Sequence, residues 1–161
     1  MIDQAAQIEE SILEAVPKVF HSMVSLDLKA EAPGALSADP KGEIMGSVGF
    51  TGKATGVVYL YAGMSFARDV TCRMLGITES DLDEGDMVCD ALGELSNMVT
   101  GHVKTRLCDA GWTCTLTIPT VVRGQQLTVK GQPPLASKIF GFRCGENFLL
   151  AQLLLKEPQA A

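Results

Sequence analysis

The chain has 161 residues, of which 47% are apolar and 20% are charged, and its formal net charge is −6. This length suits a single domain over residues 1–161, and the composition is typical of a globular chain rather than a disordered one. The basic residues are scattered rather than clustered, which argues against binding to nucleic acid or to an anionic membrane.

The N-terminal stretch MIDQAAQIEESI has neither the basic region nor the apolar region of a signal peptide. The apolar runs are shorter than the roughly 20 residues that a membrane-spanning helix needs. The five cysteines are an odd number and form no C-x-x-C pair. We therefore expect a cytoplasmic protein with reduced cysteines, no membrane segment and no metal site of its own.

The first half of the chain predicts one helix followed by strands. Apolar residues recur at helical spacing over residues 3–24, although Pro17 predicts a kink or a break there. A short strand is expected at 26–32 and a loop at 32–42. Residues 43–51 and 54–62 predict a β-hairpin with its turn at Gly52-Lys53. Glycines within these strands indicate bulges or close packing of a helix on the sheet.

The second half predicts two helices and then further strands. The first helix spans 64–76 and ends at Gly76, and the second runs from about 84 to 109 after an acidic approach at 78–84. Strands are expected at 113–122, 127–130, 137–143 and 148–156, with Gly-Gln-Gln at 124–126 as a turn. The predicted fold is α+β: an antiparallel sheet with two long helices packed on one face.

The long helix at 84–109 has two distinct faces. Its apolar arc, which should lie on the sheet, consists of Met87, Val88, Ala91, Leu92, Leu95, Met98, Val99 and Val103. Asp90, Glu94, Asn97 and Gly101 fall together on the opposite side, and Glu94 and Asn97 are neighbours because they are three residues apart. Glycine inside a helix costs about 1 kcal/mol relative to alanine, so Gly93 and Gly101 suggest that a neighbouring element or a partner protein approaches the backbone.

Spacing alone leaves the function of this face open. Acids and amides on an outer helix face are commonly just solvated surface. The group lacks the His or Cys ligands of a metal site and the paired carboxylates of a glycosidase. The sequence also contains no GxxxxGKS phosphate loop, no GxGxxG motif after a strand and no GxSxG elbow.

The stretch from Asp90 to Gly101, DALGELSNMVTG, resembles the helix of CheX and CheC phosphatases, whose signature is Glu-x-x-Asn followed by a glycine. The resemblance extends to Ile118-Pro-Thr, to the glycine-rich hairpin at 46–61 and to Met74-Leu-Gly, and it covers about residues 5–155. It implies a CheC-like fold for the single domain at 1–161.

The resemblance also implies an activity: hydrolysis of the aspartyl phosphate of a CheY-like response regulator in chemotaxis or two-component signalling. Asn97 would orient the attacking water, and Glu94 would pair with a lysine of the receiver domain. The chain would need no cofactor, because Mg²⁺ is expected on the partner. An amide can both donate to and accept from one water, and a carboxylate accepts a charge-assisted bond from lysine.

CheC-type members carry a second such motif on the first helix, but here that helix reads Glu14-Ala-Val-Pro17, with proline in place of asparagine. One motif favours the CheX-like branch, whose members are expected to form homodimers. Two other functions stay open at this point: a non-catalytic binding or adaptor module for a response regulator or a flagellar or signalling complex, and a small-molecule binder.

Overall fold

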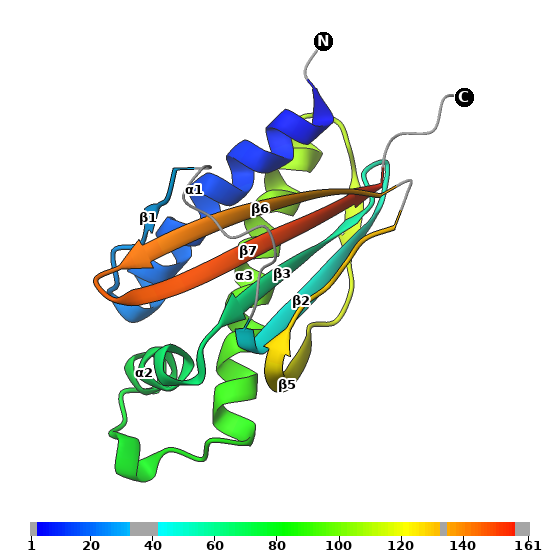
Figure 1. Ribbon diagram of the computed structural model, residues 1–161. Coiled ribbons are helices and arrows are strands. Elements are labelled where there is room, and N and C mark those ends of the chain that lie inside the picture. Colours follow the sequence, from blue (N-terminus) through cyan, green and yellow to red (C-terminus); the bar gives the residue numbers. More distant parts are fainter. Residues whose placement is uncertain (1–2, 33–41, 133–134, 157–161) are drawn as a thin grey trace.

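The computed structural model describes residues 3–32, 42–132 and 135–156. Figure 1 shows their course. In chain order the elements are α1 (Gln4–Val24), β1 (Lys29–Ala30), β2 (Gly42–Gly52), β3 (Gly56–Ala62), α2 (Met64–Leu75), the short 3₁₀ helix η2 (Glu79–Asp81), α3 (Asp86–Asp109), β4 (Cys114–Leu116), β5 (Thr120–Leu127), β6 (Leu135–Cys144) and β7 (Asn147–Lys156). None of the helices in these residues is long and apolar enough to span a membrane.

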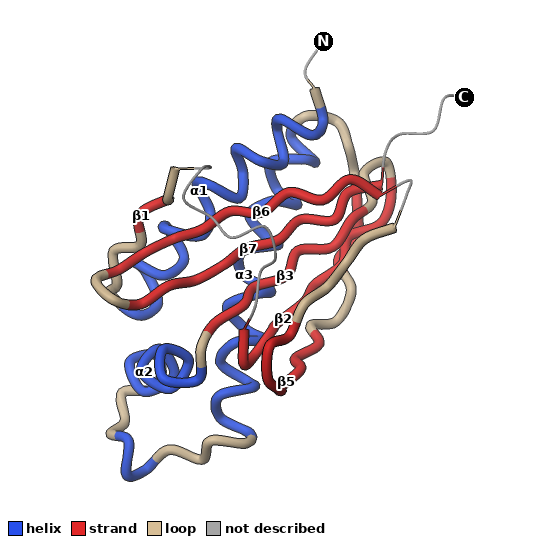
Figure 2. The backbone as a smooth tube through the Cα atoms, viewed as in Figure 1, coloured by secondary structure: helices blue, strands red, loops and turns tan. Residues whose placement is uncertain are grey.

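The strands form one antiparallel sheet in the order β1-β6-β7-β3-β2-β4, and β5 also pairs with β2. The long helices α1 and α3 lie on one face of the sheet, as Figures 1 and 2 show, and α2 packs beside α3 at one end. This arrangement confirms the α+β prediction of an antiparallel sheet with two long helices on one face. The shorter α2 is a third helix.

The main core lies between the sheet and the helices. Alternate residues of the strands point toward α1 and α3, so that Val58, Leu60 and Leu153 are almost completely buried. On the helices, Ile12 of α1 and Leu95 of α3 are fully buried against them. Burial of a side chain of this size stabilises the fold by about 1.5–3 kcal/mol, so this face fixes where α3 lies.

Pro17 does not break the first helix. Helix α1 is continuous from Gln4 to Val24 with Pro17 inside it, so of the predicted kink or break, the break is wrong. Proline inside a helix costs about 3 kcal/mol because it removes one backbone hydrogen bond and clashes with the preceding turn. The buried stripe on both sides of Pro17, which includes Val16 and Val19, packs into the core and offsets that cost.

The region after α3 also differs from the sequence prediction. The expected strand at 113–122 is two strands, β4 and β5, separated by residues 117–119, and the expected turn at 124–126 lies within β5. No strand covers 128–130. The predicted strand at 26–32 shortens to Lys29–Ala30. Most of the predicted loop at 32–42 lies outside the described residues.

Residues 117–119 form a bulge. Both strands pair with β2, with Leu116 opposite Phe50 and Thr120 opposite Ser47. The chain therefore advances by four residues over a distance that β2 covers in three. Pro119 has no amide hydrogen to give to a ladder, which explains why pairing fails here. A bulge bends its strand and turns a side chain away from the regular alternation.

The predicted hairpin is confirmed as β2 and β3, and its glycines allow close packing. A Cβ atom on Gly46 would lie 2.2 Å from Oγ of Ser96 in α3. At Gly52, where φ is +151°, a Cβ atom would lie 2.4 Å from the carbonyl oxygen of Thr113. The sequence prediction that strand glycines bring a helix close to the sheet is therefore confirmed at Gly46.

The face of the sheet opposite the helices holds a second, smaller cluster around Met45, Tyr61 and Leu150. The buried Tyr61 hydroxyl donates to Oε1 of Gln152 at 2.6 Å. Burial raises the pKa of Tyr61 to about 12, the neighbouring Tyr59 adds to the rise, and a contact with the Val129 backbone lowers it. Burial also raises the pKa of Tyr59.

This raised pKa predicts alkaline instability. Between about pH 10 and pH 12 the unfolded chain loses the Tyr61 proton while the folded chain keeps it. The free energy of unfolding should therefore fall by up to about 1.4 kcal/mol per pH unit within this range, and almost none of this contribution is lost below about pH 9. Urea denaturation at pH 8, 10 and 11 measures the slope. A Tyr61→Phe variant should show a shallower slope than the parent, and equal slopes would contradict the assignment.

Candidate functional site

Helix α3 has an inner face that fixes its position and an outer face that is free. Leu95, Val99 and Val103 are fully buried on the inner side. The buried hydroxyls of Ser96 and Thr100 donate to the carbonyl oxygens one turn earlier, each at 2.8 Å. The buried hydroxyls of the inner face are therefore hydrogen-bonded within α3 itself and need no partner from the outer face.

The outer face carries the predicted site residues. Asp90 and Glu94 are exposed and Asn97 is half-buried, so the structure brings these three together on one side of α3, which we call the α3 ridge. Among the residues that the structure describes, the side chains of Glu94 and Asn97 have no hydrogen-bond or ion-pair partner. Both can therefore reach a group that approaches from solvent.

Two shallow grooves flank the α3 ridge, and Asp90 and Glu94 line both. The first, of about 490 Å³, lies between α3 and residues 119–121 and is also lined by Cys89, Gly93, Pro119 and Val121. The second, of about 470 Å³, lies between α3 and the end of α2 and is also lined by Met74, Leu75, Met87 and Ala91. The polar ridge thus stands between two hollows: the groove beside α2 is mainly apolar, and the groove beside residues 119–121 is of mixed polarity.

The two glycines of α3 have different surroundings. A Cβ atom on Gly93 would lie 3.4 Å from Cγ2 of Val121 and 3.8 Å from Cβ of Pro119, which is ordinary contact with the chain's own strand. A Cβ atom on Gly101 would meet nothing within 4 Å. A Cβ atom would therefore fit at either position, so packing among the described residues requires glycine at neither Gly93 nor Gly101.

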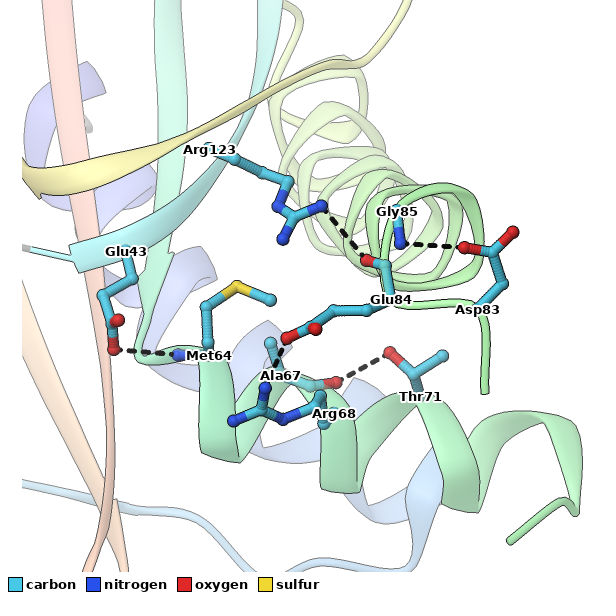
Figure 3. A network of polar contacts seen from close by, with 9 residues as sticks. All are labelled: Glu43, Met64, Ala67, Arg68, Thr71, Asp83, Glu84, Gly85 and Arg123. Carbon is cyan, nitrogen blue, oxygen red and sulfur yellow. Dashed lines mark hydrogen bonds and ion pairs between the residues drawn. The ribbon is translucent and has the colours of Figure 1, made fainter. Parts of the chain in front are cut away.

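The start of α3 is held by contacts with two other elements, α2 and β5, and by a turn in the loop before it, as Figure 3 shows. The Glu84 carboxylate pairs with Arg68 of α2, and Nη1 of Arg123 in β5 donates to the Glu84 carbonyl oxygen at 3.3 Å. The backbone N–H of Gly85 donates to Oδ1 of Asp83 at 3.0 Å. These contacts hold the N-terminal end of α3 between α2 and β5, and so fix the width of both grooves.

The first helix offers no equivalent site. Oε2 of Glu14 accepts from Nη1 of Arg106 in α3 at 2.8 Å, and Pro17 stands where an amide would be needed. Glu14 therefore joins α1 to α3.

Across the described ranges, no three His, Cys, Asp or Glu side chains are placed to hold a metal ion. All five cysteines are free. The chemical groups that the α3 ridge offers to a partner are therefore its own carboxylates and its amide.

Sequence reasoning missed the groove walls. Leu75, Pro119 and Val121 line the hollows beside the ridge, and Ile118 lies within the same bulge as Pro119. Two signals point to them: an apolar residue directly before the helix stop at Gly76, and the Ile-Pro pair that interrupts the strand.

Comparison with known proteins places the chain in a family. The model of the chemotaxis phosphatase CheX family matches residues 44–142. A curated relative, the CheY-P phosphatase CheX of Thermotoga maritima, is 27% identical over 127 residues, which cover 78% of this chain and 81% of that protein. The chain belongs to the chemotaxis phosphatase CheX family.

Solved structures have the same fold. A CheC-like superfamily protein from Shewanella sp. PV-4 has a TM-score of 0.82 and 25% identity, with 94% of this chain and 98% of that chain covered. The chemotaxis protein CheX from Vibrio vulnificus has a TM-score of 0.81 and 25% identity, with 96% and 99% covered. A complex of CheX, CheY, BeF₃ and Mg²⁺ from Borrelia burgdorferi matches with a TM-score of 0.81 and 21% identity, with 98% and 100% covered.

Proposed function

We propose that this chain is a phosphatase that hydrolyses the aspartyl phosphate of a CheY-like response regulator in the cytoplasm. The observation that carries the proposal is the α3 ridge, on which Glu94 and Asn97 stand side by side without a partner among the described residues. The family membership and the relative named a CheY-P phosphatase support the same activity.

The mechanism divides the work between two side chains. The Asn97 amide donates to and accepts from one water and holds it in line with the phosphorus atom. The Glu94 carboxylate accepts a charge-assisted hydrogen bond from a lysine of the receiver and so keeps the two proteins in register. Mg²⁺ would be held by the receiver, where it neutralises the phosphoryl oxygens. The Borrelia burgdorferi complex of CheX with CheY, BeF₃ and Mg²⁺ supports a CheY-like partner for a protein of this fold.

The test is phosphate release from a phosphorylated receiver domain. We expect the purified chain to shorten the lifetime of the aspartyl phosphate in a dose-dependent way, over a panel of receivers from the same genome. Tight binding to a receiver with an unchanged phosphate lifetime would instead favour a non-catalytic adaptor module. The homodimer stays a prediction, and the mass of the purified chain in solution tests it.

A substitution at Gly101 should change the stability and the activity of the chain in opposite directions. A Gly101→Ala change should raise the free energy of unfolding by about 1 kcal/mol, because alanine favours a helix and its methyl group meets nothing within 4 Å. The same methyl group would stand one turn from Asn97, where the receiver must come close, so phosphatase activity should fall several-fold.

Urea denaturation and phosphate release measure the two effects of Gly101→Ala. Thr105→Ala is the matched control, since Thr105 is exposed one turn further along α3 and its change should leave activity unaltered. Full activity in Gly101→Ala would contradict the close approach of a partner at this position.

A further inference from the structure

Two large exposed apolar side chains belong to the two segments that line the grooves beside the α3 ridge. Leu75, the last residue of α2, is 49% exposed, and Ile118, in the bulge between β4 and β5, is 86% exposed. Leu75 lines one groove, and Pro119, which follows Ile118, lines the other. Single exposed apolar residues are common on proteins, but a pair that flanks one polar ridge needs an explanation.

Ile118 is held out by an anchored backbone. The N–H of the preceding Thr117 donates to the carbonyl oxygen of Gly49 at 2.8 Å, and the N–H of Gly49 donates to Oγ1 of Thr117, also at 2.8 Å. The following Pro119 packs beside Gly93 of α3. The bulge is thus fixed on both sides of Ile118, so its exposure is a property of the fold.

Leu75 is fixed in a similar way. Helix α2 ends at Gly76, whose φ of +66° is the left-handed conformation that glycine adopts readily, and the Gly76 N–H bonds to the Cys72 carbonyl oxygen. Leu75 therefore sits at a defined helix end, and it lines its groove together with Met74 and Met87. Apolar contacts on this side of the ridge are preorganised, which lowers the entropy cost of binding.

The charges around the two grooves indicate what kind of partner Leu75 and Ile118 contact. The grooves are lined by the carboxylates of Asp90 and Glu94, and no Lys or Arg is among their lining residues. Carboxylates repel a phosphoryl group, so attraction must come from elsewhere on the surface. Burial of apolar area beside the ridge is the source that this surface offers.

A second copy of the chain fits this surface poorly. In a two-fold contact the same patch meets itself, so two copies joined here would bring Asp90 and Glu94 of both copies together. Like charges across an interface cost several kcal/mol. A phosphorylated receiver, with a metal ion and a lysine at its phosphorylation site, offers the opposite charge at the centre of the contact.

We propose that Leu75 and Ile118 are the two apolar contacts that hold a phosphorylated receiver domain on either side of the α3 ridge. This inference rests on the proposed function and assigns separate roles within it. Leu75 and Ile118 determine the affinity for the receiver and the choice of receiver, while Asn97 takes part in the hydrolysis. The receiver that fits must present apolar side chains on two opposite sides of its phosphorylation pocket.

Leu75→Ser and Ile118→Ser variants test the proposal. Each should raise KM for the phosphorylated receiver, and Kd for the BeF₃–Mg²⁺-treated receiver, by roughly tenfold, which is about 1.4 kcal/mol. The kcat at saturating receiver should stay within about twofold of the parent, because the reacting groups are untouched. The two residues belong to segments on opposite sides of α3, so their effects should add and the double variant should show a roughly hundredfold rise.

Leu13→Ser is the matched control. Leu13 is 42% exposed on α1, where it lines a separate groove with residues of β6, so its change should leave KM and Kd unaltered. Thermal unfolding of each variant verifies that it is folded. Unchanged KM and Kd in both Leu75→Ser and Ile118→Ser would overturn the proposal, as would a change in self-association without a change in receiver affinity.

The design separates the two proposals. If the parent chain binds the BeF₃–Mg²⁺-treated receiver without hydrolysing the phosphate, the proposed catalysis fails, but the Kd values of the two serine variants still decide the role of Leu75 and Ile118. If the parent hydrolyses the phosphate and both variants match it in KM and Kd, the inference alone fails.

Discussion

An Asn97→Ala variant is expected to lose nearly all of its ability to speed release of phosphate from a phosphorylated receiver. The amide is half-buried on the outer face of α3 and has no hydrogen-bond partner among the described residues, so its removal breaks no hydrogen bond within them. Loss of a group that positions a reactant costs about a hundredfold in rate, and we expect at least that decrease in kcat.

Single-turnover phosphate release at saturating enzyme measures this loss directly. Binding of the BeF₃–Mg²⁺-treated receiver should persist within a few-fold, because Glu94 and the groove walls remain. Thr105→Ala, on the same helix two turns away, serves as the control and should keep the parent rate. If Asn97→Ala releases phosphate as fast as the parent, an orienting amide is not part of the reaction.

The second large effect is a loss of stability where α3 packs on β2 of the sheet. A Gly46→Val change should lower the free energy of unfolding by about 3 kcal/mol. A Cβ atom at position 46 would lie 2.2 Å from Oγ of Ser96, 3.2 Å from its Cβ and 3.4 Å from the Leu92 carbonyl oxygen. Overpacking of a well-packed core costs about 1–3 kcal/mol, and the two further methyl groups of valine place this change at the upper end.

Rotation of the Ser96 side chain cannot relieve this clash cheaply. Its hydroxyl donates to the Leu92 carbonyl oxygen at 2.8 Å, and its Cβ would stay too close. Urea denaturation measures the change in the free energy of unfolding. Ser47→Val is the matched control, since residue 47 points to the opposite face of β2 and is half-buried. Equal stability of the two variants would show that α3 can shift away from β2.

Local patterns were enough to predict α3 and its faces. Helical periodicity depends on residues within a few turns of each other, so the burial of Leu95 and Val99 and the exposure of Glu94 could be read from the sequence and are confirmed. The catalytic roles of Glu94 and Asn97 stay predictions, because position on a free face does not establish turnover.

Features that depend on distant partners could not be predicted in the same way. The bulge at 117–119 exists because β4 and β5 both pair with β2, about 70 residues earlier, with one extra residue. The continuity of α1 through Pro17 depends on packing against the sheet and α3. The groove walls at Leu75 and Pro119 are brought to Glu94 by the tertiary fold alone.

The ion pair between Glu14 and Arg106 bears on how the proposed phosphatase rate depends on the concentration of receiver. Helix α1 contains no asparagine, and this carboxylate is already engaged, so one copy of the chain serves one receiver at a time. The rate should then saturate along a simple hyperbola as receiver is added. Any sigmoidal response would have to arise between copies of the chain.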